Sequence, residues 1–297
     1  MPLPTVLPPV VRGVIASLIL GGFTALIALP LFAIALLKLL IPLRPWRRLC
    51  STALNGIAAA WIEVNRLWMP RLDGVDWHVA EGAAVDRRNG YLVTCNHQSW
   101  ADIFIAQTVL NRRLPQLKFF LKQELIWVPV IGLCWWALDF PFMKRYDRAY
   151  LKKHPEKIGK DLETARAACE KFRDLPVSLF IFLEGTRFST AKHTKQKSPY
   201  THLLKPKTAA AGLVFGNLGQ QVKTLVDLTI GYHGQVPSFW DLLCGRARQV
   251  SVVVAVRPVP ATLLGRDYTA DSAFRTELNR WGNELWEEKD RRLENIF

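Results

Sequence analysis

The stretch TCNHQSWADI, positions 94–103, places a histidine and an aspartate, His97 and Asp102, close together directly after an apolar run. A carboxylate that holds one imidazole nitrogen while the other faces a substrate hydroxyl is the arrangement of general-base catalysis. In one unbroken helix these two side chains would point about 140° apart. If a strand ends at Cys95 and a helix begins near residue 99 or 100, His97 lies in the turn and folds back toward Asp102. The stretch therefore predicts a base and its orienting group.

A purely structural interpretation of the same residues stays open. Ser99 or Asn96 would cap a helix, His97 would be a turn residue, and Asp102 would be a polar helix position. An N-H-x-x-x-x-D match arises by chance in roughly one sequence of this length in thirty. A second motif is needed to choose.

That second motif is FLEGTRFS, at positions 182–189. A strand that ends in Glu184-Gly185-Thr186-Arg187 supplies a glycine for close backbone approach, a hydroxyl donor and a guanidinium that grips a phosphate bidentately. By itself the motif is equally compatible with a tight turn that carries a solvated arginine.

Together and in this order, the two stretches resemble the glycerolipid or lysophospholipid acyltransferases, whose first hallmark is NHxxxxD and whose third is FPEGTR. The second hallmark of that family, a glycine followed by a phenylalanine and an arginine, has a counterpart in Gly132, Phe142 and Arg145. Leu183 stands where the usual third hallmark has proline. The resemblance covers about residues 88–235.

Two further runs resemble the branch of 1-acylglycerol-3-phosphate and lysocardiolipin acyltransferase-like proteins. They are HLLKPKTAAA at 202–211 and LVDLTIGY at 225–232. The second run lacks the proline of the family's fourth hallmark.

The resemblance implies transfer of a fatty acyl group from acyl-CoA or acyl carrier protein to the free hydroxyl of a lysophospholipid. The first expected acceptor is 1-acylglycerol-3-phosphate, which would give phosphatidate; lysophosphatidylglycerol and lysocardiolipin fit the same site. No cofactor and no metal are expected, and the sequence leaves the donor, the headgroup and the acyl-chain length open.

The residues receive roles within this chemistry. His97 would take the hydroxyl proton, and Asp102 would fix the tautomer of the ring. Lys205 and Lys207 would contact anionic groups of the lipid or of the acyl donor. The acceptor would be bound, phosphate first, by Arg145, Glu184, Gly185, Thr186 and Arg187.

Composition points to anionic partners and to a membrane surface. The chain has 39 Lys and Arg against 25 Asp and Glu, a net charge of +14 and an isoelectric point near 9.8. The 11 tryptophans favour a membrane surface over nucleic acid, because tryptophan is enriched at the headgroup level. The five cysteines form no CxxC pair and the histidines lack paired spacing, which indicates a reduced protein without a zinc site.

The N-terminal segment is apolar. Residues 13–37 carry no charge, and as a helix they would extend roughly 37 Å, enough to cross a bilayer core. Pro30 and the Gly21-Gly22 pair leave a second possibility, a hairpin that dips into one leaflet. The basic residues at 38–48 place the downstream domain on the cytoplasmic side.

The remainder predicts one α/β domain, glycerolipid-acyltransferase-like with a central mixed sheet, behind this membrane-anchoring helix or hairpin. We expect the anchor at 1–50 and the domain at 51–297, with a helix within 54–69 and an exposed basic loop at 187–207. Strands are expected at 90–95, 177–183, 225–232 and 250–256, and helices at 100–110, 157–173 and 274–295.

Two other classes of function compete with this prediction. A lipase or thioesterase would use His97 with a serine or cysteine nucleophile, but the sequence holds no GxSxG elbow. A non-enzymatic membrane adaptor or nucleic-acid binder would account for the basic charge and leave the ordered motifs as coincidence.

Overall fold

The computed structural model describes residues 7–73, 76–80, 85–143, 176–247 and 249–296, together with residues 154, 163, 166, 167, 169, 170 and 172. Arg145 and most of the helix expected at 157–173 lie outside the described residues.

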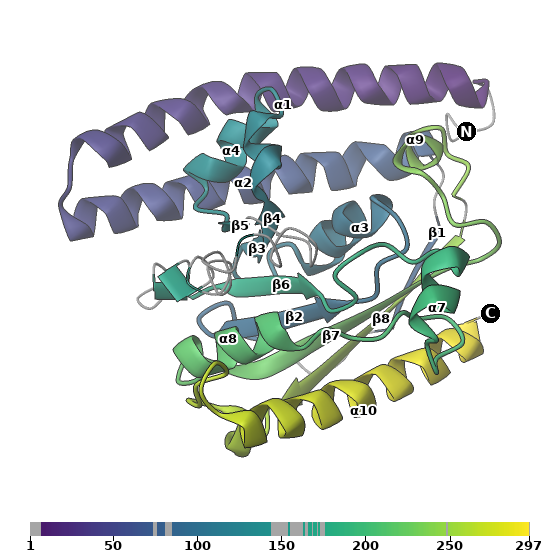
Figure 1. Cartoon of the computed structure of the whole chain (residues 1–297). Coiled ribbons are helices and arrows are strands. Elements are labelled where there is room, and N and C mark those ends of the chain that lie inside the picture. The colour runs from purple at the N-terminus through teal and green to yellow at the C-terminus, as the bar shows by residue number, and fades with distance from the viewer. Residues whose placement is uncertain are drawn as a thin grey trace.

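A mixed six-stranded sheet forms the centre of the protein, as the sequence predicted (Figure 1). The strand order is β1-β8-β7-β2-β6-β3. Strand β2 is parallel to both of its neighbours, β6 and β7, whereas β8 runs antiparallel to β7. The bounds are β1 (Asp76–Ala80), β2 (Gly90–Cys95), β3 (Leu117–Phe119), β6 (Ser178–Phe182), β7 (Val222–Tyr232) and β8 (Gln249–Pro258).

Helices cover both faces of this sheet (Figure 1). Helices α8 (Ala209–Leu218) and α10 (Ser272–Ile296) pack on one face, in a core that includes Leu92. Helix α3 (Ala101–Leu110) and the N-terminal helices pack on the other, in a core that includes Tyr91 and Val93. Alternate side chains of β2 thus enter opposite cores, which explains why the whole strand is buried and almost all of it is apolar.

The N-terminal segment forms a hairpin of two helices, and its turn lies after α1 and not at the break that the sequence left possible. Helix α1 (Pro9–Leu40) runs without interruption through Gly21-Gly22 and Pro30. It packs antiparallel along α2 (Arg44–Asp73), where the Trp61 indole donates to the Thr24 hydroxyl at 3.0 Å. The domain boundary expected at residue 50 therefore falls inside α2, because the two helices bury each other.

The basic segment 187–207 is not the exposed loop that its charge suggested. It contains helix α7 (Thr190–Gln196), and Tyr200, Leu203 and Leu204 are buried. The lysines are spaced so that apolar side chains between them reach the core under α10.

Shorter elements complete the fold between these parts. A second, two-stranded sheet lies under the hairpin. These elements are β4 (Leu121–Lys122), β5 (Phe142–Met143), the helices α4 (Ile131–Ala137) and α9 (Phe239–Leu243), and the 3₁₀ turns η2 (Gln123–Trp127) and η4 (Ala261–Leu263).

A buried lysine joins the hairpin to the sheet domain. Lys118 of β3 donates to the Asn55 side chain of α2 at 2.8 Å and to the Leu138 carbonyl after α4 at 2.6 Å. Its ammonium also lies 5.1 Å from the centroid of the Phe140 ring. Burial lowers the pKa of Lys118 from 10.5 to about 7, against a smaller opposing effect of Asp139.

This lowered pKa predicts a pH dependence of stability. Between pH 7 and pH 9 the unfolded chain holds a proton that folded Lys118 releases, so stability rises with pH. Wild type should gain about 2 kcal/mol over Lys118→Met across this interval, since one proton contributes roughly 1.4 kcal/mol per pH unit. Denaturant unfolding of both proteins in detergent at several pH values measures the difference. Parallel pH curves would contradict the assignment.

Candidate active site

The carboxylate of Asp102, in the first turn of α3, is fully buried and has its acceptor positions filled. Its Oδ2 accepts the backbone amides of Gln98 at 2.7 Å and Ser99 at 2.8 Å, and lies 2.9 Å from Nδ1 of His97. Its Oδ1 accepts the hydroxyl of Tyr232, at the end of β7, at 2.5 Å. The contact predicted between His97 and Asp102 is present, across the predicted strand-to-helix turn.

The His97 ring is held in one orientation. It stacks on Phe182 with ring centroids 3.8 Å apart and planes at 14°. A carboxylate only accepts hydrogen bonds, so Nδ1 carries the ring proton and Nε2 of the neutral ring is the acceptor. No described residue binds Nε2, and the side chain is 12% exposed. The ring can therefore receive a proton from a bound molecule.

The backbone of His97 is fixed from the second motif. Its amide donates to Oε1 of Glu184 at 2.8 Å, and its carbonyl accepts the amide of Phe188 at 2.7 Å. Asn96, the other candidate cap, instead pairs its side chain with both the amide and the carbonyl of Ile230 in β7. The strand end is thus tied to both neighbouring strands.

Glu184, which the sequence analysis placed in the acceptor-binding set, lies behind the turn. Its second oxygen accepts the amide of Leu204 at 3.0 Å, so both oxygens are bound by backbone amides. The side chain is fully buried, and this burial raises the pKa of Glu184 to about 7, although the amide hydrogen bonds from His97 and Leu204 oppose the rise.

Local hydrogen bonds and the backbone conformation of Gly185 fix the turn Gly185-Thr186-Arg187. Gly185 has φ +68°, which disfavours a side chain, and its amide donates to the Phe182 carbonyl at 2.9 Å. The amide expected at a phosphate is therefore used inside the turn. Lys192 of α7 clamps the turn, because its ammonium donates to the Thr186 hydroxyl and to the Arg187 carbonyl, both at 2.8 Å.

Arg187 is exposed and lies beside the dyad. Its guanidinium carbon is 5.2 Å from the ring of Trp100, which follows His97 in the same turn. The Lys207 side chain runs against Gly185, where an added Cβ would come within 3.2 Å of it. Thr186, Arg187 and Lys207 thus lie close together, whereas Lys205 is exposed and binds Gln196 through its amide.

An apolar cavity of about 710 Å³ opens next to this turn. Its wall includes Trp100 and Phe104 on one side, Trp61 of α2 and Leu20 of α1 on another, and Trp135 of α4. The hairpin, α3 and α4 thus enclose a space that suits a hydrocarbon chain.

The neighbouring nucleophiles are occupied or inert. Burial raises the pKa of the Cys95 thiol well above its ordinary value, which disfavours the thiolate. The Ser99 hydroxyl donates to the Pro237 carbonyl and accepts the Ala101 amide. Within the described part of the chain, no group of three or more His, Cys, Asp or Glu residues could hold a metal ion.

Sequence reasoning missed Tyr232 and Lys192. Tyr232 ends a predicted strand, and the register of β7 against β2 is what brings it to Asp102. Lys192 stood in a run of lysines that looked solvated. Of these two residues, only Tyr232 could have been found from the sequence, because a tyrosine hydroxyl at the end of a buried strand needs a hydrogen-bond partner.

Known proteins resemble this chain in sequence and in fold. A family described as Acyltransferase matches residues 78–216. The mouse 1-acyl-sn-glycerol-3-phosphate acyltransferase gamma is 27% identical over 212 residues, which cover 67% of this chain and 51% of the relative. The human delta protein is 26% identical over 220 residues, 69% of this chain and 53% of the relative. The chain spans about half the length of these curated relatives.

A solved structure shares the fold. It is that of the 1-acyl-sn-glycerophosphate (LPA) acyltransferase PlsC from Thermotoga maritima, with a TM-score of 0.53 and 18% identity, covering 97% of this chain and 94% of the other. Residues 78–216 are therefore similar to acyltransferases in sequence, and the chain shares the fold of PlsC.

Proposed function

We propose that this protein transfers a fatty acyl group from a thioester donor, acyl-CoA or acyl carrier protein, to the free hydroxyl of a lysophospholipid. The observation that carries the proposal is the unoccupied Nε2 of a carboxylate-oriented His97, placed between Arg187 and an apolar cavity. The matched relatives named as 1-acyl-sn-glycerol-3-phosphate acyltransferases support 1-acylglycerol-3-phosphate as the first acceptor.

The reaction needs no side-chain nucleophile. Nε2 of His97 takes the proton as the acceptor oxygen attacks the thioester carbonyl, and Asp102 stabilises the imidazolium that forms. The tetrahedral intermediate then expels the thiolate, which receives the proton from His97. An ester bond forms and a thioester bond breaks, so the enzyme returns to its starting state.

Acceptor recognition rests on the exposed cations around the second motif. Arg187, with the Thr186 hydroxyl, would bind the phosphate, and its stacking on Trp100 fixes the guanidinium beside the dyad. Lys207 would add a second positive charge from the far side of Gly185. Arg145 remains part of the proposed set on the strength of the family motif.

The apolar cavity would take an acyl chain. It begins at Trp100, one residue before α3, and continues between the hairpin and α4. A chain seated there keeps its carboxyl end next to His97, which suits the transferred acyl group.

The hairpin supports association of the protein with a membrane. Helix α1 is long and apolar enough to cross a membrane, yet it packs against α2, α4 and α9. We therefore propose that the hairpin lies in one leaflet, with the domain on the cytoplasmic side beside the basic residues after α1. Large apolar side chains exposed toward that leaflet include Leu18, Leu26, Leu29, Leu36, Leu40 and Trp127.

Removal of the base tests the mechanism directly. His97→Ala and Asp102→Asn should lower the rate of acyl transfer by about 10³-fold, within the range of a lost general base. The measurement is transfer from labelled acyl-CoA or acyl carrier protein to a panel of lysophospholipids by purified, detergent-solubilised protein. His233→Ala, an exposed histidine paired with Ser251, is the matched control. Equal rates in wild type and His97→Ala would show that TCNHQSWADI is only a structural turn without a catalytic role.

Replacement of the guanidinium tests phosphate recognition. Arg187→Lys keeps the charge but loses the planar fork, so the KM for 1-acylglycerol-3-phosphate should rise about tenfold, and further in Arg187→Ala. Lys195→Ala removes the same charge from the exposed side of α7 and serves as control. Monoacylglycerol, which lacks phosphate, should be insensitive to Arg187; an equal loss with it would contradict the assignment.

Tyr232→Phe tests the positioning of the dyad. The variant removes one donor from Asp102, so kcat should fall about three- to tenfold with little change in KM. With one donor fewer, the carboxylate stabilises the imidazolium more, and the acid limb of the pH profile should move to higher pH. Tyr200→Phe, whose hydroxyl contacts Asn283, is the control. A lower kcat with an unmoved pH profile would indicate packing alone.

A further inference from the structure

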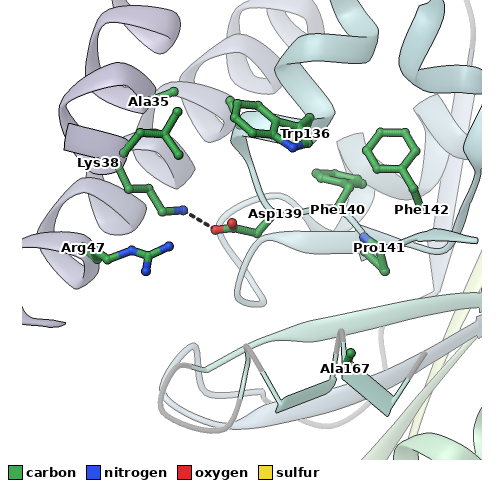
Figure 2. A pocket seen from close by; sticks show the side chains of 11 residues that line it. Ala35, Lys38, Arg47, Trp136, Asp139, Phe140, Pro141, Phe142 and Ala167 are labelled. Carbon is green, nitrogen blue, oxygen red and sulfur yellow. Dashed lines mark hydrogen bonds and ion pairs between the residues drawn. The ribbon is translucent and has the colours of Figure 1, made fainter. Parts of the chain in front are cut away.

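A second cavity, of about 350 Å³, lies at the turn of the hairpin (Figure 2). It is bounded by the end of α1, the start of α2 and the loop that follows α4. None of the dyad residues and none of the EGTR turn line it. The cavity therefore lies apart from the dyad and the EGTR turn, although Phe140 lines both this cavity and the apolar one, and Phe142 of the second hallmark is in its wall.

Cationic side chains outnumber carboxylates around this cavity. Lys38 of α1 forms an ion pair with Asp139, which neutralises the carboxylate. Arg47 lines the same cavity and is exposed, and its guanidinium binds no described residue. Lys118 lies directly behind, bound to the carbonyl of Leu138. The two cations that line the cavity, Lys38 and Arg47, thus share a single carboxylate, and the remaining positive charge favours an anion.

The walls and the location of the cavity are those of a membrane interface. Trp136, about half exposed, and Phe140 form an aromatic side next to the cations, as Figure 2 shows. Leu39, which also lines the cavity, is exposed at the end of α1. Cations beside aromatic and apolar groups at a bilayer boundary bind phosphate headgroups.

We propose that this cavity binds the phosphate-bearing headgroup of an anionic phospholipid, with Arg47 and Lys38 at the phosphate and Trp136 at the level of the glycerol. The proposal rests on the membrane association proposed above, but not on acyl transfer. A lipid held there fixes the end of the hairpin in the leaflet and thereby orients the apolar cavity that opens next to the dyad.

A lipid headgroup fits the cavity better than a free anion. The volume exceeds what inorganic phosphate fills, and the exposed Leu39 and Trp136 match the glycerol and the first methylenes of a lipid. A lipid headgroup and inorganic phosphate both present a phosphate group, so an experiment must distinguish the two ligands.

The test is retention of phosphatidylglycerol by the purified full-length chain in detergent, counted by native mass spectrometry over a titration. Phosphatidylcholine is the zwitterionic comparison, and excess inorganic phosphate is the competitor. Arg47→Gln removes the cation in the cavity, whereas Arg44→Gln removes the same charge one turn earlier on α2, outside the cavity. The titration is repeated in an Arg187→Ala background, so that lipid bound at the dyad is not counted.

We expect one phosphatidylglycerol per chain in wild type and in Arg44→Gln, weakened about tenfold in Arg47→Gln, with phosphatidylcholine retained poorly. Equal losses in Arg44→Gln and Arg47→Gln would show a diffuse surface charge and overturn the proposal. Displacement by the excess inorganic phosphate, or equal retention of phosphatidylcholine, would overturn the lipid assignment.

Unfolding temperatures of the variants in detergent show that each is folded before its retention is compared. Retention requires no acyl donor and no turnover, so the two proposals fail separately. A chain that retains phosphatidylglycerol without transferring acyl groups would overturn only the enzymatic proposal. A chain that transfers acyl groups but retains no phosphatidylglycerol would overturn only this one.

Discussion

The buried carboxylate of Asp102 is the constraint around which the catalytic end of the protein is organised. An isolated charge in an apolar interior is very costly, and four donors remove that cost here. Those donors come from the turn before α3, from the His97 ring and from Tyr232 at the end of β7. Because each must reach the same two oxygens, the strand end, the helix start and the imidazole are fixed together.

A second buried carboxylate, Glu184, fixes the other motif in the same way, through hydrogen bonds from backbone amides. Parallel pairing of β2 with β6 brings Cys95 opposite Phe182, so the two motifs leave the sheet side by side. Glu184 then binds the amide of His97, while the His97 carbonyl binds the amide of Phe188. The motifs, far apart in sequence, become one site through backbone hydrogen bonds, which leaves Arg187 and the His97 ring free to meet a ligand.

The polar site and the apolar hairpin are structurally connected through the apolar cavity. The wall of the apolar cavity combines Trp100 and Phe104 at the site with residues of α1 and α2, so the hairpin completes a space that the sheet domain leaves open. Lys118 and the ion pair of Lys38 with Asp139 fasten the hairpin at its turn. The proposed reaction needs this connection, because the hydroxyl of a lysophospholipid held in a bilayer would have to reach His97 without leaving the membrane surface.

The sequence by itself determined the elements and the chemistry that depend on local order. Apolar runs predicted β2, β6, β7 and β8, helical spacing predicted α3 and α10, and a short turn sufficed to predict the contact of His97 with Asp102. Tertiary structure decided what depends on register and on packing. It brought Tyr232 to Asp102, turned Glu184 toward the backbone, used the Gly185 amide within its turn and paired α1 with α2. Side chains far apart in sequence come into contact only through strand pairing and helix packing. A local sequence pattern determines neither the neighbours of a strand nor the face on which a helix packs.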